Sequence, residues 1–379
     1  MSALIETTST ATTTTSAPST LGLEAIDHIE WWVGNARAFA ALLASGFGFA
    51  VTAWAGPETG CHDRLSYVLE QGSVRFVVTS ALDPDSPITN HVHRHGDGVR
   101  DVAFTVVDAP AAYRGAVDRG AEAVRPPAVV TDEHGTVVRA TIAAYGETRH
   151  TFVERGRYRG PFAPGFELPE LTAPLGPAVG LDAVDHVVAN VELGALDRWV
   201  DFYGRVLGFE QLLHFDDDTI STEYSALMST VVWDGGRIVL PINEPANGRR
   251  KSQIEEYLDY YRGPGVQHIA LRTDDIVGAV RSLRARGVRF LAVPPAYYEE
   301  ARRRLDGVDL PWDELADLGI LVDRDPEGHL LQIFTETVTG RPTAFFEIIQ
   351  REGARGFGAG NFKALFEAIE REQARRGNL

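Results

Sequence analysis

The stretch VDHVVANV (184–191), followed by ALDRWVDFYGRVLGFEQL (195–212), decides the fold expected for this chain. The first part is an apolar run with the length of a β-strand. The second part is a helix by its apolar spacing at i, i+3, i+4 and i+7, which falls on Trp199, Phe202, Tyr203 and Val206. Gly208 closes this helix, as expected where the chain must turn left-handed to leave it. Strand-like runs follow, so the pattern predicts a βαβββ unit.

The same unit occurs four times along the chain. The other copies begin with the strands IDHIEWWV (26–33), VRDVAFTV (99–106) and VQHIALRT (266–273). Their helices end at Gly48, Gly120 and Gly287, and a strand is expected directly after each glycine, at VRFL (288–291) in the last copy. An ordinary α+β protein with chance self-similarity is the weaker interpretation, because four copies share one order of elements. We therefore predict an α+β fold with four βαβββ modules paired into two half-barrel domains.

Composition divides the chain into five segments. A Thr- and Ser-rich tail at 1–20 is expected to be disordered, because it lacks the apolar residues of a core. The Pro- and Gly-rich run RYRGPFAPGFELPELTAPLGPAVG (157–180) supplies a boundary near Pro169. The predicted parts are thus a tail, an N-terminal domain without metal, a linker, a C-terminal catalytic domain and a C-terminal lid helix. Their limits are 1–20, 21–160, 161–180, 181–355 and 356–379.

The bulk composition excludes several classes of function. The 379 residues carry a formal net charge of −17, which argues against nucleic acid as a partner, because phosphate binding needs a concentrated basic face. The single cysteine, Cys61, cannot form an internal disulfide. No stretch approaches the ~18–20 apolar residues of a membrane span. The tail lacks the basic start and apolar middle of a secretory signal, so a cytoplasmic protein is expected.

Most of the 11 histidines do not suggest a metal site. The three in NHVHRHGDG (90–98) precede a Gly-rich turn, and we expect them in a solvated loop. Three others fall at turns or strand starts and are expected to serve in hydrogen bonding: His134, His150 and His329.

His186 and His268 are different, because each lies in the opening strand of a repeat unit. Matching positions of a pseudo-symmetric sheet face each other, so the two imidazoles can converge on one ion. Glu347 in RPTAFFEIIQR (341–351) is a lone acid among Phe and Ile, where an unpaired charge is costly. Two histidines and one carboxylate leave coordination positions open, as in non-haem Fe(II) oxygenases. An ion pair of Glu347 with Arg341 or Arg351 is the alternative.

The N-terminal half lacks this full set. His28 matches His186, Glu154 is expected to match Glu347, and Asp101 stands where His268 would be. One metal is therefore expected, in the C-terminal domain only. The sequence contains no G-x-S-x-G string, which would indicate a Ser/His/Asp triad, and no Walker-type string, which would indicate a phosphate-binding loop.

Several strings make the resemblance to a known family specific. They include DHVVANVELG (185–194), KSQIEEYL (251–258), ILVDRDPEGHLLQIFTE (320–336) and GFGAGNFKALFEAIE (356–370). The chain resembles the 4-hydroxyphenylpyruvate dioxygenase family of the vicinal-oxygen-chelate (glyoxalase-like) superfamily. This resemblance implies one Fe(II) per chain, held by His186, His268 and Glu347. It also implies oxidative decarboxylation, ring hydroxylation and side-chain migration, which turn 4-hydroxyphenylpyruvate and O₂ into homogentisate and CO₂ in tyrosine catabolism. Relatives are usually homodimers or homotetramers.

The resemblance also implies which residues form the substrate pocket. Catalytic roles fall on Gln267, Gln332, Phe334 and Asn361. Substrate-binding roles fall on Val188, Ser229, Pro241, Asn243, Gln253, Phe345, Phe357 and Phe362. Phe334 and Phe362 would sandwich the substrate ring, and Ser229, Asn243 and Gln253 would face its phenol. The phenylalanines could equally be plain core, and Asn243 could cap a turn.

The last segment predicts a helix that begins at an Asn361 cap. Its apolar stripe is Phe362, Leu365, Phe366 and Ile369. The glycines before it favour a hinged lid, although the helix could simply dock on the core.

Three other functions compete with the dioxygenase. Hydroxymandelate synthase uses the same substrate and iron but hydroxylates the benzylic carbon, and the intact phenylalanine walls disfavour it. A non-catalytic small-molecule-binding protein on the same fold would not need three metal ligands. An extradiol catechol oxygenase is disfavoured by the aromatic slot and the C-terminal helix.

Overall fold

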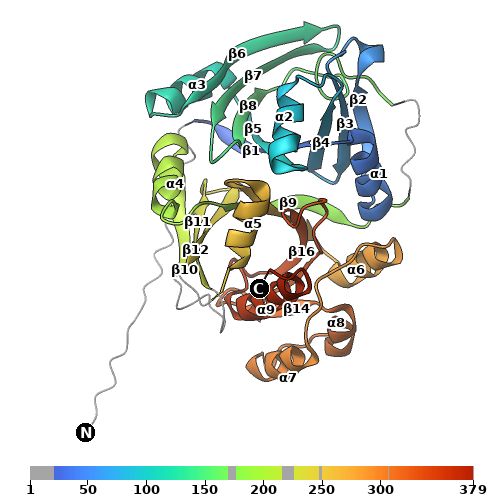
Figure 1. Cartoon of the computed structure of the whole chain (residues 1–379), viewed down its shortest axis with the longest axis vertical. Helices are drawn as coiled ribbons and strands as arrows, with labels where there is room; N and C mark the ends of the chain where they lie inside the picture. The colour runs from blue at the N-terminus through green and yellow to red at the C-terminus, as the bar shows by residue number, and fades with distance from the viewer. Residues whose placement is uncertain (1–20, 170–175, 216–225, 247–249, 306, 379) are drawn as a thin grey trace.

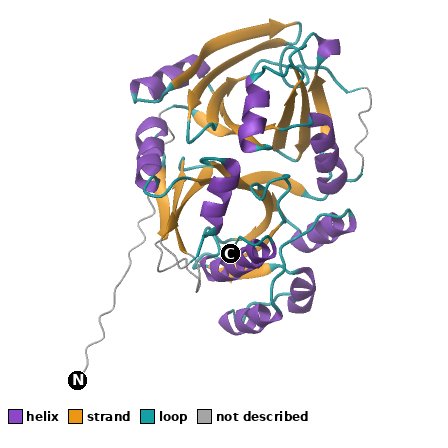
Figure 2. Cartoon of the chain, viewed as in Figure 1, coloured by secondary structure: helices purple, strands orange, loops and turns teal. Residues whose placement is uncertain are grey.

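The computed structural model describes residues 21–169, 176–215, 226–246, 250–305 and 307–378. Two eight-stranded sheets, each curved into a half-barrel, lie one above the other with helices around them (Figures 1 and 2). The predicted disordered tail at 1–20 and part of the predicted linker lie outside the described residues. The α+β class and the glyoxalase-like pairing of modules are confirmed.

The N-terminal sheet has the strand order β2-β3-β4-β1-β5-β8-β7-β6. Its strands are β1 (Leu23–Trp32), β2 (Ala50–Ala55), β3 (Arg64–Gln71), β4 (Val74–Ala81), β5 (Gly98–Val106), β6 (Ala123–Asp132), β7 (Gly135–Ala143) and β8 (Arg149–Glu154). The helices of this half are α1 (Ala36–Phe47), α2 (Pro87–His95) and α3 (Ala109–Asp118), with a 3₁₀ turn at Pro57–Thr59.

The C-terminal sheet repeats this order as β10-β11-β12-β9-β13-β16-β15-β14. Its strands are β9 (Leu181–Asn190), β10 (Glu210–Phe215), β11 (Ala226–Trp233), β12 (Val239–Ala246), β13 (Gly265–Thr273), β14 (Leu321–Arg324), β15 (His329–Phe334) and β16 (Phe345–Glu352). The helices are α4 (Leu196–Phe202), continued by a π-helical turn (Tyr203–Leu207), α5 (Gln253–Tyr261), α6 (Ile276–Ala285), α7 (Pro295–Arg304), α8 (Trp312–Leu318) and α9 (Ala359–Arg375).

Each half contains two βαβββ modules, joined at their first strands. In the N-terminal half β1 pairs with β5 antiparallel, and in the C-terminal half β9 pairs with β13 antiparallel. The closing glycines adopt the predicted left-handed conformation, with φ of 76° at both Gly48 and Gly208. The repeat read from the sequence is therefore confirmed.

The fourth module departs from the predicted pattern. The prediction of a strand at 288–291 is wrong, because this segment makes only an isolated bridge between Phe290 and Thr335. The helices α7 and α8 are inserted after it, and the second strand of the module forms only at β14. The insertion places α7 beside the start of α9, where Tyr297 and Asn361 form a hydrogen bond of 2.5 Å.

Two local predictions are also wrong. The segment around His91 and His95 is not a solvated loop but the helix α2, capped by Ser86, and both imidazoles are buried. Asn361 does not cap the last helix, because α9 begins at Ala359 after Gly358.

The turn before α9 requires a glycine at position 358. The side chain of Gln332 lies against Gly358, where a Cβ would come 2.8 Å from its Oε1. A glycine with a φ of 73° fits this turn where a larger residue would collide.

One hydrophobic core is shared by the two sheets. Phe346 of the C-terminal sheet packs between aromatic rings of the N-terminal one, 5.9 Å from Trp31 and 5.7 Å from Phe76. This apolar contact fixes the two halves against each other. Among the described residues, no helix is long and apolar enough to cross a membrane.

Candidate metal centre

Three neighbouring strands bring His186, His268 and Glu347 to one face of the C-terminal sheet. The central strand, β13, pairs its Ala270 with His186 of β9 on one side and with Glu347 of β16 on the other. His268 lies two residues before Ala270, so its side chain points to the same face. The small side chain of Ala270 leaves the space that the three larger groups share. The pseudo-symmetric sheet thus brings the predicted ligands together.

The ligand atoms lie at the spacing of groups that share one ion. The Nε2 atoms of His186 and His268 lie 3.2 Å and 3.4 Å from Oε2 of Glu347. All three side chains are buried, and their ligand atoms lie within 4.8 Å of one another. Two imidazoles and one carboxylate on one side of a site fit a divalent metal with open positions for other ligands. The residues present therefore form a two-histidine, one-carboxylate metal site.

The electrostatics of the site favour a cation beside Glu347. Burial alone would raise the pKa of this carboxyl, but the charge of His186 and the hydrogen bonds of both histidines hold it below its ordinary value. Burial lowers the pKa of His268. Burial would also lower the pKa of His186, but the charge of Glu347 and the hydrogen bond of Asp185 raise it to about 9. A carboxylate that stays ionised while buried is suited to hold a metal ion.

The second nitrogen of each imidazole is fixed by a neighbouring residue. Nδ1 of His186 lies 2.7 Å from Asp185, and Nδ1 of His268 lies 3.0 Å from Oε1 of Gln267. Partners of this kind set the tautomer that leaves Nε2 free for a metal. Neither of the two arginines considered as a partner pairs with Glu347 in the described part of the chain: Arg351 binds Asp185, and Arg341 donates to backbone carbonyls.

A cavity opens above the three ligands. Besides the ligands, it is lined by ten of the residues predicted for the site: Val188, Ser229, Pro241, Asn243, Gln253, Gln267, Gln332, Phe334, Phe345 and Phe357. The ring of Phe345 stacks on His268 at 4.8 Å, and Phe334 meets the same imidazole edge-on at 6.1 Å. Ser229 and Asn243 face each other across β11 and β12. The cavity therefore has aromatic walls beside the ligands and a polar end.

One predicted pocket residue does not line this cavity, and another lies outside the residues whose side chains are described. Asn361 is fully buried, but its side chain bonds Tyr297 rather than lining the cavity. The side chain of Phe362 lies outside the described part of the chain. Five lining residues were not predicted for the pocket itself: Phe215, Leu227, Val231, Leu365 and Phe366. For Leu227 and Val231 of β11 the available signal was their alternation, because every second residue of a strand faces the same side. Leu365 and Phe366 belong to the apolar stripe expected for the last helix.

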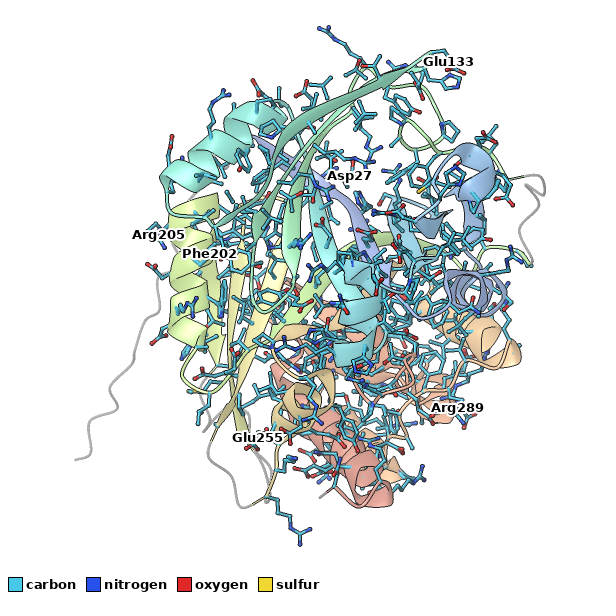
Figure 3. The ribbon with its side chains drawn as sticks, turned by 45° about the horizontal axis from the view of Figure 1, so that its top comes forward. Asp27, Glu133, Phe202, Arg205, Glu255 and Arg289 are labelled. Atoms are coloured by element: carbon cyan, nitrogen blue, oxygen red, sulfur yellow. The ribbon has the colours of Figure 1, made fainter. Side chains whose placement is uncertain are left out.

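The N-terminal sheet contains the counterpart of this site, without its ligands. His28 pairs with Ala103 as His186 pairs with Ala270, and Asp101 occupies the position of His268, as predicted. The match of Glu154 to Glu347 is wrong, because the strand register places Thr151 there. Thr151 donates its backbone N–H to Asp101 at 3.0 Å, so the buried carboxyl of Asp101 has a hydrogen-bond partner within the protein. Figure 3 shows Asp27, the neighbour of His28, among the strands of this sheet.

Comparisons with known proteins agree with this geometry. Residues 183–333 match the Glyoxalase/Bleomycin resistance protein/Dioxygenase superfamily. The chain is 49% identical to 4-hydroxyphenylpyruvate dioxygenase of Dictyostelium discoideum, covering 94% of this chain and 100% of that protein. It is 46% identical to the enzyme of Yarrowia lipolytica, with 93% of each chain covered.

A solved structure is also similar over nearly the whole chain. It is a mutant of 4-hydroxymandelate synthase from Streptomyces coelicolor, with a TM-score of 0.84 and 38% identity, covering 93% of this chain and 99% of that one. The sequence relatives span both half-barrels and the metal site. The chain therefore belongs to the 4-hydroxyphenylpyruvate dioxygenase family.

Proposed function

We propose that this protein is an Fe(II)-dependent dioxygenase that converts 4-hydroxyphenylpyruvate and O₂ into homogentisate and CO₂, as a step of tyrosine catabolism. The observation that carries the proposal is the placement of two histidines and one carboxylate at the base of an aromatic-lined cavity, in a chain of this family. One Fe(II) per chain, held by His186, His268 and Glu347, would supply open coordination positions for a chelating 2-oxo acid and for O₂.

The protein's own residues would bind and orient the substrate. The rings of Phe334 and Phe345 lie beside His268, where they can hold the aromatic ring of the substrate close to the ligands. Ser229, Asn243 and Gln253 would hydrogen-bond the phenol at the polar end of the cavity. Gln267 and Gln332 lie nearer the ligands, and the buried Oε1 of Gln332 finds no partner among the described residues. An orphaned amide there is available to a bound ligand.

The helix α9 would exclude water from the reaction. Leu365 and Phe366 line the cavity, and Leu365 packs in one cluster with Phe334 and Phe345. In Figure 1 the helix lies across the lower half-barrel beside α5. Phe362 and Asn361 belong to the first turns of this helix, and we retain them as proposed site residues. A helix that covers the site prevents side reactions of a strong oxidant with solvent.

The second candidate is 4-hydroxymandelate synthesis, favoured by the structural likeness to the synthase from Streptomyces coelicolor. The two reactions share substrate and metal and differ in the carbon that is hydroxylated. The deciding experiment is anaerobic reconstitution with Fe(II), addition of 4-hydroxyphenylpyruvate and O₂, and identification of products by mass and retention time. Homogentisate with CO₂ would support the proposal. Hydroxymandelate would show that the product assignment is wrong, although the assigned substrate and metal site would stand. No oxygen uptake by the iron-loaded protein would contradict both. We also propose a homodimer or homotetramer, which light scattering would test.

A further inference from the structure

A second group of histidine and carboxylate side chains lies away from the catalytic cavity, between the two half-barrels. His91 and His95 stand one turn apart on α2, and Glu147 comes from the turn between β7 and β8. The two imidazoles are each only 2% exposed, although His91 and Glu147 border a wide polar cleft. The ligand atoms of the three residues lie within 4.8 Å of one another. This group satisfies the same spacing as the catalytic one.

The hydrogen bonds of His95 fix which of its nitrogens faces the carboxylate. Nδ1 bonds the backbone carbonyl of Tyr261, at the end of α5. A carbonyl can only accept, so Nδ1 carries the proton, and Nε2 of the neutral ring is a lone pair. This buried Nε2 has no hydrogen-bond partner among the described residues and faces Oε1 of Glu147 at 3.4 Å. When the ring is neutral, Nε2 and Oε1 are two acceptors that face each other, and a cation between them removes their repulsion.

The geometry repeats that of the catalytic ligand His268. There too Nδ1 bonds an oxygen, and Nε2 lies 3.4 Å from a carboxylate oxygen. Ligands about 2.0–2.1 Å from a tetrahedral ion are separated by about 3.3 Å, which both pairs approach. A histidine that ligates a metal usually donates its other ring N–H to a carbonyl or carboxylate, as His95 does. The separation is longer than a good hydrogen bond and suits two ligands of one ion.

His91 and two arginines complete the surroundings of Glu147. Nδ1 of His91 lies 2.8 Å from Oε2, and its buried Nε2 has no hydrogen-bond partner in the described structure. Arg100 donates to Oε2 at 2.9 Å, and Arg94 lies 3.9 Å from Oε1. Arg100 takes one lone pair of Oε2, so an ion can replace the proton between Nδ1 of His91 and Glu147 and also meet Nε2 of His95. The arginine charges disfavour a hard cation bound only by charge, and favour one that coordinates imidazole strongly.

We propose that His91, His95 and Glu147 bind one divalent transition-metal ion of the Zn²⁺ class, at a site separate from the catalytic metal. The cleft beside Glu147 leaves room for a water as the fourth ligand. The ion stabilises the contact between the halves, because His95 of α2 is bonded to the end of α5. This inference does not depend on the proposed dioxygenase activity.

The test counts metal ions in the full-length chain after removal of metal with a chelator and equilibration with ZnCl₂. Excess metal is removed by gel filtration, and bound zinc is measured by mass spectrometry. We expect two ions per chain in the wild type, one in Glu147→Gln, one in His186→Ala and none in the double variant. The matched control is His93→Ala, which changes an exposed histidine of the same helix and should retain two ions.

Two further measurements keep the test decisive if a variant folds poorly. In the His186→Ala chain, Co²⁺ should produce the visible absorption of a tetrahedral site, and Zn²⁺ should raise the Tm. Circular dichroism without metal reports whether Glu147→Gln is folded. One zinc per wild-type chain, or equal zinc in Glu147→Gln and His93→Ala, would overturn the proposal. So would a His186→Ala chain that binds neither Zn²⁺ nor Co²⁺.

Discussion

Asp185 and Arg351 form a two-pronged ion pair directly behind the metal ligand His186. The guanidinium donates from Nε and Nη2 to the two carboxylate oxygens, each at 2.8 Å, while Oδ1 of Asp185 also lies 2.7 Å from Nδ1 of His186. The same arginine stacks over the ring of Phe357, 5.4 Å away. One arginine thus links the orientation of a ligand to a wall of the cavity. The N-terminal sheet repeats the arrangement with Asp27, His28 and Arg155, where no metal triad exists in the described residues.

This relationship predicts that Asp185→Asn weakens iron binding while the ligands remain. Loss of such an orienting carboxylate typically costs 10–100-fold in metal affinity. The measurement is Fe(II) affinity by competition with a chelator. Asp27→Asn is the matched control, because it removes the same contacts from His28 and should lower stability without loss of iron. Equal iron affinity in the two variants would contradict the orienting role.

The ligand set itself predicts that His186→Ala, His268→Ala and Glu347→Ala each abolish tight iron binding and turnover. Each removal leaves a divalent ion with two protein ligands, too few for a stable site. Iron per chain, measured after gel filtration, checks the result. His134→Ala, at an exposed position of the N-terminal half, should keep full iron and activity. If one of the three variants kept full iron and turnover, the residue changed in it would not be a metal ligand.

The aromatic wall predicts a change of product in Phe334→Leu. The smaller side chain would let the substrate ring shift away from the position that favours ring hydroxylation, so the share of hydroxymandelate should rise several-fold and total turnover should fall. Product ratios from chromatography and mass spectrometry measure it. Phe290→Leu, a buried phenylalanine that does not line the cavity, should lower the Tm but leave the product ratio unchanged. An unchanged ratio in Phe334→Leu would remove this residue from product control.

The end of α9 is held to α5 by Arg376, which contacts both oxygens of Glu256 at 3.1 Å and 2.6 Å. Arg376→Ala should therefore loosen α9, with faster amide exchange across 359–375 and a raised KM. The control is Arg375→Ala, whose side chain pairs only with Glu372 of its own helix among the described contacts. Identical exchange in the two variants would show that the ion pair does not hold the helix.

Asp101 predicts a pH dependence of stability. Burial, aided by the charge of Glu30, raises its pKa from 3.8 to about 7 in the folded protein. The group therefore stabilises the fold fully below pH 3.8, and this contribution is lost as pH rises through about 7. Asp101→Asn removes the titration, so its free energy of unfolding relative to the wild type should rise by on the order of 2 kcal/mol between pH 5 and pH 8.

Denaturant titrations at the two pH values check this change. Asp85→Asn, at an exposed position, should show no such trend. A constant difference between Asp101→Asn and the wild type across this range would mean that Asp101 titrates normally.

The sequence alone determined the repeat and indicated the three ligands. Helical spacing and the closing glycines are local properties of the chain, so the four modules could be recognised without coordinates. Equivalent positions of two repeated modules come close together in a pseudo-symmetric sheet. His186 and His268 could therefore be predicted to bind the same ion, although they are far apart in the sequence. The lone acid Glu347 completed the set, because an unpaired charge among Phe and Ile requires a partner.

Tertiary structure alone decided what depends on register and on long-range packing. A strand register cannot be counted across loops, so Glu154 was matched where Thr151 belongs, and the partner of Arg351 proved to be Asp185 rather than Glu347. His91 and His95 were predicted to lie in a polar loop. Their burial comes from contacts with Glu147 and with Tyr261 at the end of α5, both far away in the sequence. Local patterns specify elements, whereas the free energy of burying a polar side chain depends on neighbours that only the folded chain supplies.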